Sequence, residues 1–228
     1  MAMDQFIVWL VSFMTAVAPP GRPQYIEEAK ETKEEALLRY ESIAEDIATV
    51  VTTEEPLFRG PEGRLRTATV IMSVMLWESG YRKDVDTGIG KLARGDRGNS
   101  VCLMQLNVGK KRTIAWNLKE DRTPRWGDNP EDIHPGWSAD ELLADRKVCI
   151  QGGLRTLRMS FRSCGRLPVT EWLRAYASGS CEDGSKESNI RMGTALRWYS
   201  SHRPDFTDAD LLPPPAEPDQ PLTVAVLD

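Results

Sequence analysis

The sequence predicts a mainly α-helical single domain with one glycine-rich insertion between helices. The chain has 228 residues, of which 40% are hydrophobic, and this length suits one core better than two. Several stretches carry apolar residues at intervals of three and four, the spacing of a helix that buries one side. Residues 80–109 instead contain six glycines among polar residues, which is typical of a long loop with short strands.

Composition and charge exclude several classes of protein. Lys and Arg total 29 against 34 Asp and Glu, a net charge of −5, so we expect no nucleic-acid partner. No apolar run reaches the roughly 20 residues that cross a bilayer, so no stable transmembrane anchor is expected. The four cysteines have no C-x-x-C spacing and the chain has only two histidines, so we expect neither a metal site nor a cofactor. Cys164 and Cys181 flank one segment and are either a disulfide pair or buried free thiols.

The first element is an apolar N-terminal segment, residues 1–23. Its apolar stretch, Phe6 to Ala18, is interrupted only by Ser12 and Thr15, and its length suits either a signal-peptide core or a buried helix. Residues 16–18 have the small-x-small form of a cleavage site. Asp4 stands where a signal peptide carries basic residues, which favours a retained helix. Both interpretations stay open.

The next two elements are predicted helices of different character. From Gln24 to Val51, apolar residues recur at three and four with Glu and Lys between them, so this helix is amphipathic. From Arg64 to Ser79 there is little polar surface, which indicates a central, buried helix. The glycine-rich insertion then covers residues 81–111 and, as a long loop in a compact domain, is a candidate for a functional segment.

The C-terminal half predicts three more helices and a tail. Ser138 and Glu141 have capping-box spacing and begin a helix that runs to about Phe161. Two shorter helices are expected over about 170–176 and 186–201. Six prolines follow His202, so we expect residues 204–228 to be a Pro-rich, extended or disordered tail. The catalytic domain would then be residues 24–203.

Glu78 is the first candidate for chemistry. Ile71, Val74 and Met75 precede it by seven, four and three positions, which places its carboxyl group on their side of an apolar helix. Burial disfavours the carboxylate and raises the pKa, the condition that a general acid needs near neutral pH. The alternative is that Glu78 lies at a frayed helix end and contacts water.

Three short segments in order extend this interpretation: residues 77–81 (Trp-Glu-Ser-Gly-Tyr), 95–106 (Gly-Asp-Arg-Gly-Asn-Ser-Val-Cys-Leu-Met-Gln-Leu) and 175–179 (Ala-Tyr-Ala-Ser-Gly). Together they resemble the lysozyme-like superfamily, and most of all the soluble lytic transglycosylases and goose-type lysozymes. The resemblance covers residues 64–200. It implies a lysozyme-like domain with a glycine-rich loop or small β insertion after the catalytic helix.

The resemblance also implies roles for single residues. Glu78 matches the catalytic acid, and Asp96 matches an aspartate that assists attack by water in goose-type enzymes. Met104 and Gln105 match the motif that lines the cleft, Tyr176 matches a tyrosine near the acid, and Ser100 in the same block is a further substrate-binding candidate. The chain departs from the pattern at Cys102, where glycine is usual, at Ala177, where asparagine is usual, and at Asn107, where goose-type enzymes have a second aspartate.

The implied activity is cleavage of the β-1,4 bond between N-acetylmuramic acid and N-acetylglucosamine, with peptidoglycan glycan strands as partner. A single acid suffices if the substrate's own 6-hydroxyl attacks and leaves a 1,6-anhydro end, as in lytic transglycosylases, and this is the outcome we expect. Hydrolysis would need a second carboxylate, Asp96 or else Asp86. Two other classes stay open: a thiol hydrolase using Cys102 and His134, and a wall-binding or virion protein that kept the fold without turnover.

Location is not determined by the sequence. The cell envelope or periplasm, the extracellular space and a phage lysin or virion are all compatible with it. The oligomeric state is likewise open.

Overall fold

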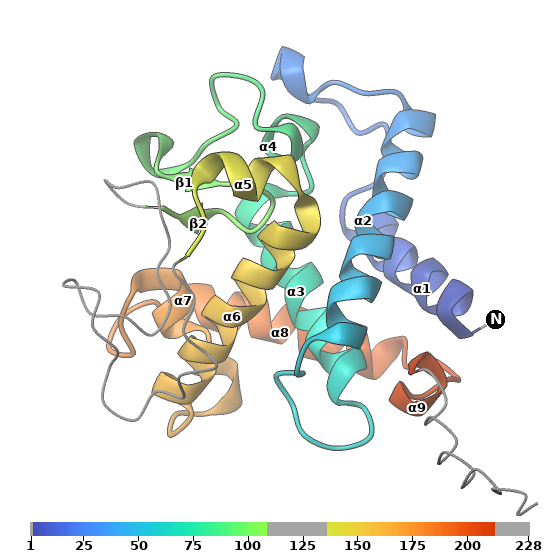
Figure 1. Ribbon diagram of the computed structural model, residues 1–228, viewed down its shortest axis with the longest axis vertical. Coiled ribbons are helices and arrows are strands. Elements are labelled where there is room, and N and C mark those ends of the chain that lie inside the picture. Colours follow the sequence, from blue (N-terminus) through green and yellow to red (C-terminus); the bar gives the residue numbers. More distant parts are fainter. Residues whose placement is uncertain (1, 109–135, 213–228) are drawn as a thin grey trace, which may run out of the picture.

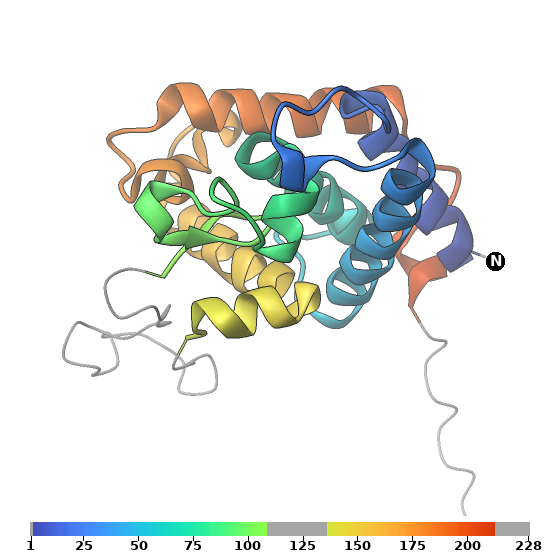
Figure 2. The same cartoon turned by 90° about the horizontal axis from the view of Figure 1, so that it is seen from above.

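Helix α3 (Gly63–Ser79) lies at the centre of the molecule (Figure 1). The computed structural model describes residues 2–108 and 136–212. Twelve of the seventeen residues of α3 are buried, as its apolar sequence predicts. In the view from above, α3 lies between α6 (Arg146–Cys164) and α8 (Ser185–Ser201) (Figure 2).

Helices α1 (Ala2–Val17) and α2 (Lys33–Thr53) pack against each other and against α3. In α1, Phe6, Leu10, Phe13 and Met14 are fully buried, so the apolar N-terminal segment is part of the core. Helix α2 was predicted to begin at Gln24. It begins nine residues later because Thr32 caps it in a capping box with Glu35, and the residues before it form only the 3-10 turn η1 (Glu27–Ala29).

The glycine-rich insertion contains short elements rather than a bare loop. Helix α4 (Lys83–Thr87) is followed by the 3-10 turn η2 (Asp96–Gly98). Strands β1 (Ser100–Val101) and β2 (Leu106–Asn107) then pair antiparallel, with Ser100 opposite Asn107 and Val101 opposite Leu106. The prediction of a small β insertion after the central helix is thus confirmed.

The helix predicted from Ser138 to Phe161 is two helices. The Ser138–Glu141 capping box begins α5 (Ala139–Ala144) as predicted. Asp145 is extended, with φ −137° and ψ 113°, and its side chain accepts a hydrogen bond from the Lys147 amide (2.8 Å). Asp145 therefore ends α5 and caps the new helix α6.

The C-terminal part contains η4 (Val169–Glu171), α7 (Arg174–Ser178), α8 and α9 (Asp208–Leu211). The single helix expected over 170–176 is divided between η4 and α7. The tail expected from residue 204 is not extended throughout, because α9 forms within it and packs on α1 and α3. Residues 213–228 of that tail lie outside the described residues.

The carboxylate of Asp208 holds α9 against the start of α3. This carboxylate, 9% exposed, accepts hydrogen bonds from the Arg64 amide (2.7 Å) and the Leu65 amide (3.1 Å) at the start of α3. The local N-cap residue Glu62 makes no such bond. The acid from α9 therefore satisfies the amides that the central helix leaves unpaired at its N-terminus.

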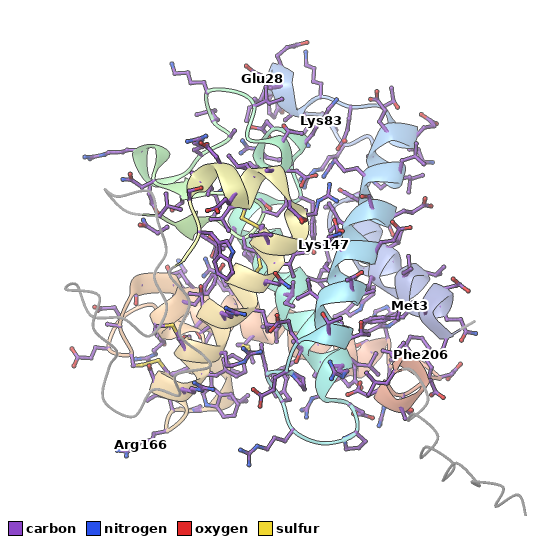
Figure 3. The ribbon with its side chains drawn as sticks, viewed as in Figure 1. Met3, Glu28, Lys83, Lys147, Arg166 and Phe206 are labelled. Carbon is purple, nitrogen blue, oxygen red and sulfur yellow. A yellow bond between two sulfur atoms is a disulfide. The ribbon has the colours of Figure 1, made fainter. Side chains whose placement is uncertain are left out.

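In the described ranges the chain forms one mainly α-helical domain with nine α-helices and a small antiparallel hairpin. Two disulfides, Cys102–Cys149 and Cys164–Cys181, join its segments, and their sulfur atoms are yellow in Figure 3. For Cys164 and Cys181 the structure thus has a disulfide rather than free thiols. Within residues 2–108 and 136–212, no helix is both long and apolar enough to cross a membrane.

Candidate active site

A cleft of about 550 Å³ lies beside the C-terminal end of α3. Segments distant in the sequence form its walls: the last turn of α3, the η2–β2 segment, one residue of α6, helix α7 with the turn after it, and α8. The lining residues are Glu78, Asp96, Ser100, Gln105, Leu106, Asn107, Thr156, Ala175, Tyr176, Ala177, Ser178, Gly179 and Arg191. All three segments of the sequence resemblance therefore contribute to one cleft.

Glu78 is held in this cleft by the way α3 ends. Gly80 adopts φ 58° and ψ 25°, and its amide donates to the Leu76 carbonyl (2.9 Å), so the last turn is closed rather than frayed. The Glu78 side chain is 18% exposed. Burial raises the pKa of Glu78; Arg191 opposes this rise, and the negative charge of Asp96 adds to it. The expected direction of the shift agrees with the structure.

Arg191 of α8 is the functional candidate that sequence reasoning missed. Its Nη2 donates to Oε1 of Glu78 at 2.7 Å, and its side chain is 12% exposed. The two residues are 113 positions apart in the chain. No local pattern marks Arg191, because one arginine in an amphipathic helix is ordinarily a surface residue. Only the packing of α3 on α8 brings the pair together.

Tyr176 joins α7 to the loop of residues 95–106, called the motif loop below. Its hydroxyl donates to the Met104 carbonyl (2.5 Å), and its amide donates to Ser160 Oγ (3.0 Å). Burial, and to a lesser extent the nearby Glu78, raises the pKa of Tyr176 well above its ordinary range. The residue is therefore a neutral hydrogen-bond donor beside the acid at all physiological pH values.

Gln105 lines the cleft as expected, whereas Met104 does not. Oε1 of Gln105 accepts from the Gly95 amide (2.9 Å) and its Nε2 donates to the Cys102 carbonyl (3.1 Å). The amide thus holds the loop in shape. The Met104 side chain is fully buried and does not line the cleft. It packs in the hydrophobic core, in a turn where Cys102 and Gln105 both have positive φ.

Asp96 and Ser100 lie together at the other wall. Ser100 Oγ donates to Asp96 Oδ2 at 2.5 Å, and both residues line the cleft. Asp86, the second-choice carboxylate, lies elsewhere: its side chain is 4% exposed and accepts two hydrogen bonds from Arg146, each of 2.9 Å. Among the described residues, Glu78 and Asp96 are therefore the two carboxylates of the cleft.

The departures from the family pattern also have a structural context. Ala177 and Asn107 line the cleft, so these differences lie where substrate would be contacted. Cys102 is bonded to Cys149 and is 2% exposed. A thiol hydrolase with Cys102 as nucleophile is therefore excluded in this structure, since a disulfide has no thiolate to attack with. His134, its suggested base, lies outside the described residues.

The part of the chain that the structure describes has no cluster of three or more His, Cys, Asp or Glu residues suited to a metal ion. No protein-family model matches the chain, and no curated protein or solved structure matches it either.

Proposed function

We propose that this protein is a peptidoglycan-cleaving glycosidase with a lysozyme-like fold. It would act on the β-1,4 bond between N-acetylmuramic acid and N-acetylglucosamine, with Glu78 as general acid and then general base. The observation that carries the proposal is the position of Glu78: a carboxyl group with a raised pKa, in a cleft lined by all three segments of the resemblance. A raised pKa keeps a fraction of the acid protonated near neutral pH.

The reaction would proceed in two proton transfers. Protonated Glu78 donates its proton to the glycosidic oxygen, so that this oxygen leaves with its bonding electrons and the muramic C1 becomes oxocarbenium-like. The carboxylate of Glu78 then accepts the proton of the substrate's 6-hydroxyl as that oxygen bonds to C1. The product is a 1,6-anhydro end, and Glu78 is protonated again. Tyr176 keeps the motif loop against α7 throughout.

Hydrolysis is the second candidate, and Asp96 favours it. This carboxylate lines the same cleft as Glu78, and its charge acts on the pKa of Glu78. In that reaction Asp96 would orient or deprotonate water, which would attack C1 in place of the 6-hydroxyl. The products would then have reducing ends.

Digestion of purified sacculi tests the proposal. We expect the wild-type protein to release muropeptides that mass spectrometry identifies by the water-loss mass of anhydro ends. Glu78→Gln should lower the rate at least about 100-fold, as expected for loss of a general acid. Glu45→Gln, on the exposed surface of α2 outside the cleft, is the matched control and should retain full activity.

Each other result has a definite meaning. Reducing ends in place of anhydro ends would favour hydrolysis, and Asp96→Asn should then lower the rate. Binding of sacculi without release of fragments would favour a non-catalytic wall-binding or virion protein and would overturn the enzymatic proposal. Full activity of Glu78→Gln would overturn the assignment of the acid.

A further inference from the structure

We propose that Arg191 is a positioning residue that orients Glu78 in the cleft and sets the upper pH limit of the reaction. This inference rests on the proposed function, because it assigns Arg191 a part in the same acid–base step. No segment of the sequence resemblance includes Arg191. The assignment comes from the ion pair, its burial and the way α8 is fixed on α3.

The ion pair has the geometry of a fixed contact. Arg191 Nη2 and Glu78 Oε1 are 2.7 Å apart, and the two side chains are 12% and 18% exposed. The Nε atom of Arg191 is buried and has no hydrogen-bond partner within the described part of the chain. Glu78 is thus the acceptor that holds the guanidinium in place, and solvent screens the pair weakly.

Two hydrogen bonds join helix α8 to α3 close to this pair. Ser73 Oγ donates to the Arg191 carbonyl (2.7 Å), and Trp77 Nε1 donates to Thr194 Oγ1 (3.3 Å). The first bond holds the main chain of Arg191 itself, and the second lies one residue before Glu78. Since Ser73 holds the main chain of Arg191 and a side-chain bond joins the two helices beside Glu78, the guanidinium has a defined position relative to the acid.

The charged groups around Glu78 oppose one another. Arg191 acts from α8 and favours the carboxylate, whereas Asp96 acts from η2 and favours the protonated form. Tyr176, from α7, stays neutral. Among the described residues that line the cleft, Arg191 is the single cation. Without Arg191, burial and the charge of Asp96 would both raise the pKa of Glu78 with no cation to oppose them.

Arg191 would affect two steps of the reaction. When Glu78 donates its proton, a carboxylate forms in a poorly solvated site, and the guanidinium stabilises it. Loss of Arg191 should therefore lower kcat at the pH optimum. The same loss makes Glu78 hold its proton to higher pH, so the alkaline limb of the pH–rate profile should move upward. A residue with a merely structural role would lower activity without moving this limb.

Direct titration of Glu78 tests the inference without substrate. In protein labelled with ¹³C at glutamate side chains, the Glu78 signal is identified by its loss in Glu78→Gln. We expect Arg191→Gln to raise the titration midpoint by about 1 to 3 pH units, the usual effect of removing an opposite charge at this distance. The alkaline limb of activity should rise with it. Arg197→Gln, an exposed position on α8, should change neither.

Arg191→Lys separates the role of charge from that of geometry. Lysine keeps a cation but lacks the planar guanidinium. We expect a smaller rise of the midpoint than with glutamine and a partial recovery of kcat. An unchanged midpoint in folded Arg191→Gln, or in folded Arg191→Met if the glutamine variant is unfolded, would overturn the inference.

The two proposals fail in distinguishable ways. If the wild-type protein does not cleave sacculi but the midpoint moves as expected, the proposed function is wrong and Arg191 still controls the protonation of Glu78. If the wild-type protein cleaves sacculi and the midpoint does not move, the proposed function stands and the role of Arg191 is wrong.

Discussion

Burial of a carboxyl group makes the stability of the protein depend on pH. Because the pKa of Glu78 is higher in the folded chain than in the unfolded chain, the folded state binds the proton more tightly. The resulting stabilisation of the folded state is fully present below the ordinary pKa of glutamic acid. It is lost as pH rises through the raised pKa. Glu78 therefore favours the folded state more strongly in acid than near neutral pH.

This linkage gives a prediction that does not require activity. The free energy of unfolding of the wild type, minus that of Glu78→Gln, should decrease as pH rises from about 4 to 8. Urea denaturation at a series of pH values measures the difference. Glu45→Gln controls for the general effect of removing one negative charge. If the curves for the wild type and Glu78→Gln ran parallel over this range, Glu78 would have an unshifted pKa and its role as general acid would lose its basis.

At single positions, sequence reasoning depends on local signals. The burial of Glu78 could be predicted because apolar residues three, four and seven positions earlier share its helix face, and the three motif segments made it the candidate acid. Arg191 could not be identified, because its partner is 113 residues away. Met104 was expected at the cleft but its side chain is fully buried. The loop around it has positive φ at Cys102 and Gln105, and the residue types of a motif do not specify such backbone angles.

Helix α6 packs tightly against the motif loop at Gly153. A Cβ atom at Gly153 would lie 2.0 Å from Met104 Sδ, and Met104 is fully buried. At Gly193 of α8, the nearest atom to a Cβ would be Arg197 Nη1 at 3.1 Å, which belongs to the tip of a flexible, exposed side chain. The two glycines are both helical but differ in what surrounds them.

We therefore expect opposite effects of alanine at these two glycines. Gly153→Ala should destabilise the protein by about 1–3 kcal/mol, because the core beside Met104 becomes overpacked. Gly193→Ala should be neutral or stabilise by about 0.5–1 kcal/mol through helix propensity. Denaturant unfolding of both variants measures this. Equal effects of the two substitutions would show that the close packing of the motif loop on α6 does not depend on Gly153.

How well the start of each helix could be predicted depended on whether a capping motif or only the spacing of apolar residues was used. The buried pattern of α3 and the capping box of α5 gave their starts to within a residue. Periodicity alone began α2 too early, since the residues before Thr32 form only the 3-10 turn η1 and the capping box of Thr32 begins the α-helix. The tail was judged by its prolines, yet Thr207 and Asp210 form a capping box that begins α9. That signal was present in the sequence and was outweighed by composition.

On the scale of the whole molecule, the two ends of the described chain meet. Trp9 Nε1 donates to the His202 carbonyl (2.6 Å), and the rings of Phe6 and Phe206 have centroids 6.0 Å apart. Met3 of α1 and Phe206, just before α9, are labelled on this side of the molecule in Figure 3. Helix α1 thus completes the core that α8 and α9 would otherwise leave open.

Two disulfides join helix α6 to two other segments of the chain. Cys149 near its start is bonded to Cys102 in the motif loop, and Cys164 at its end is bonded to Cys181 in the turn before α8. No free cysteine exists among the described residues. The loops on two sides of the cleft are therefore tied to one helix, and we expect the native protein to form both bonds in an oxidising environment.

Removal of each disulfide in turn tests this arrangement. Double serine variants at Cys102 and Cys149, or at Cys164 and Cys181, should each lose about 2–5 kcal/mol of stability. The first bond spans 47 residues and the second 17. Because closing a longer loop restricts the unfolded chain more, the first variant should lose about 1 kcal/mol more than the second.

Denaturant unfolding measures both losses, and alkylation with mass spectrometry counts free thiols. Four thiols that alkylate in the native wild-type protein would contradict the pairing, whereas equal losses would mean that the unfolded chain is not the main origin of the stabilisation.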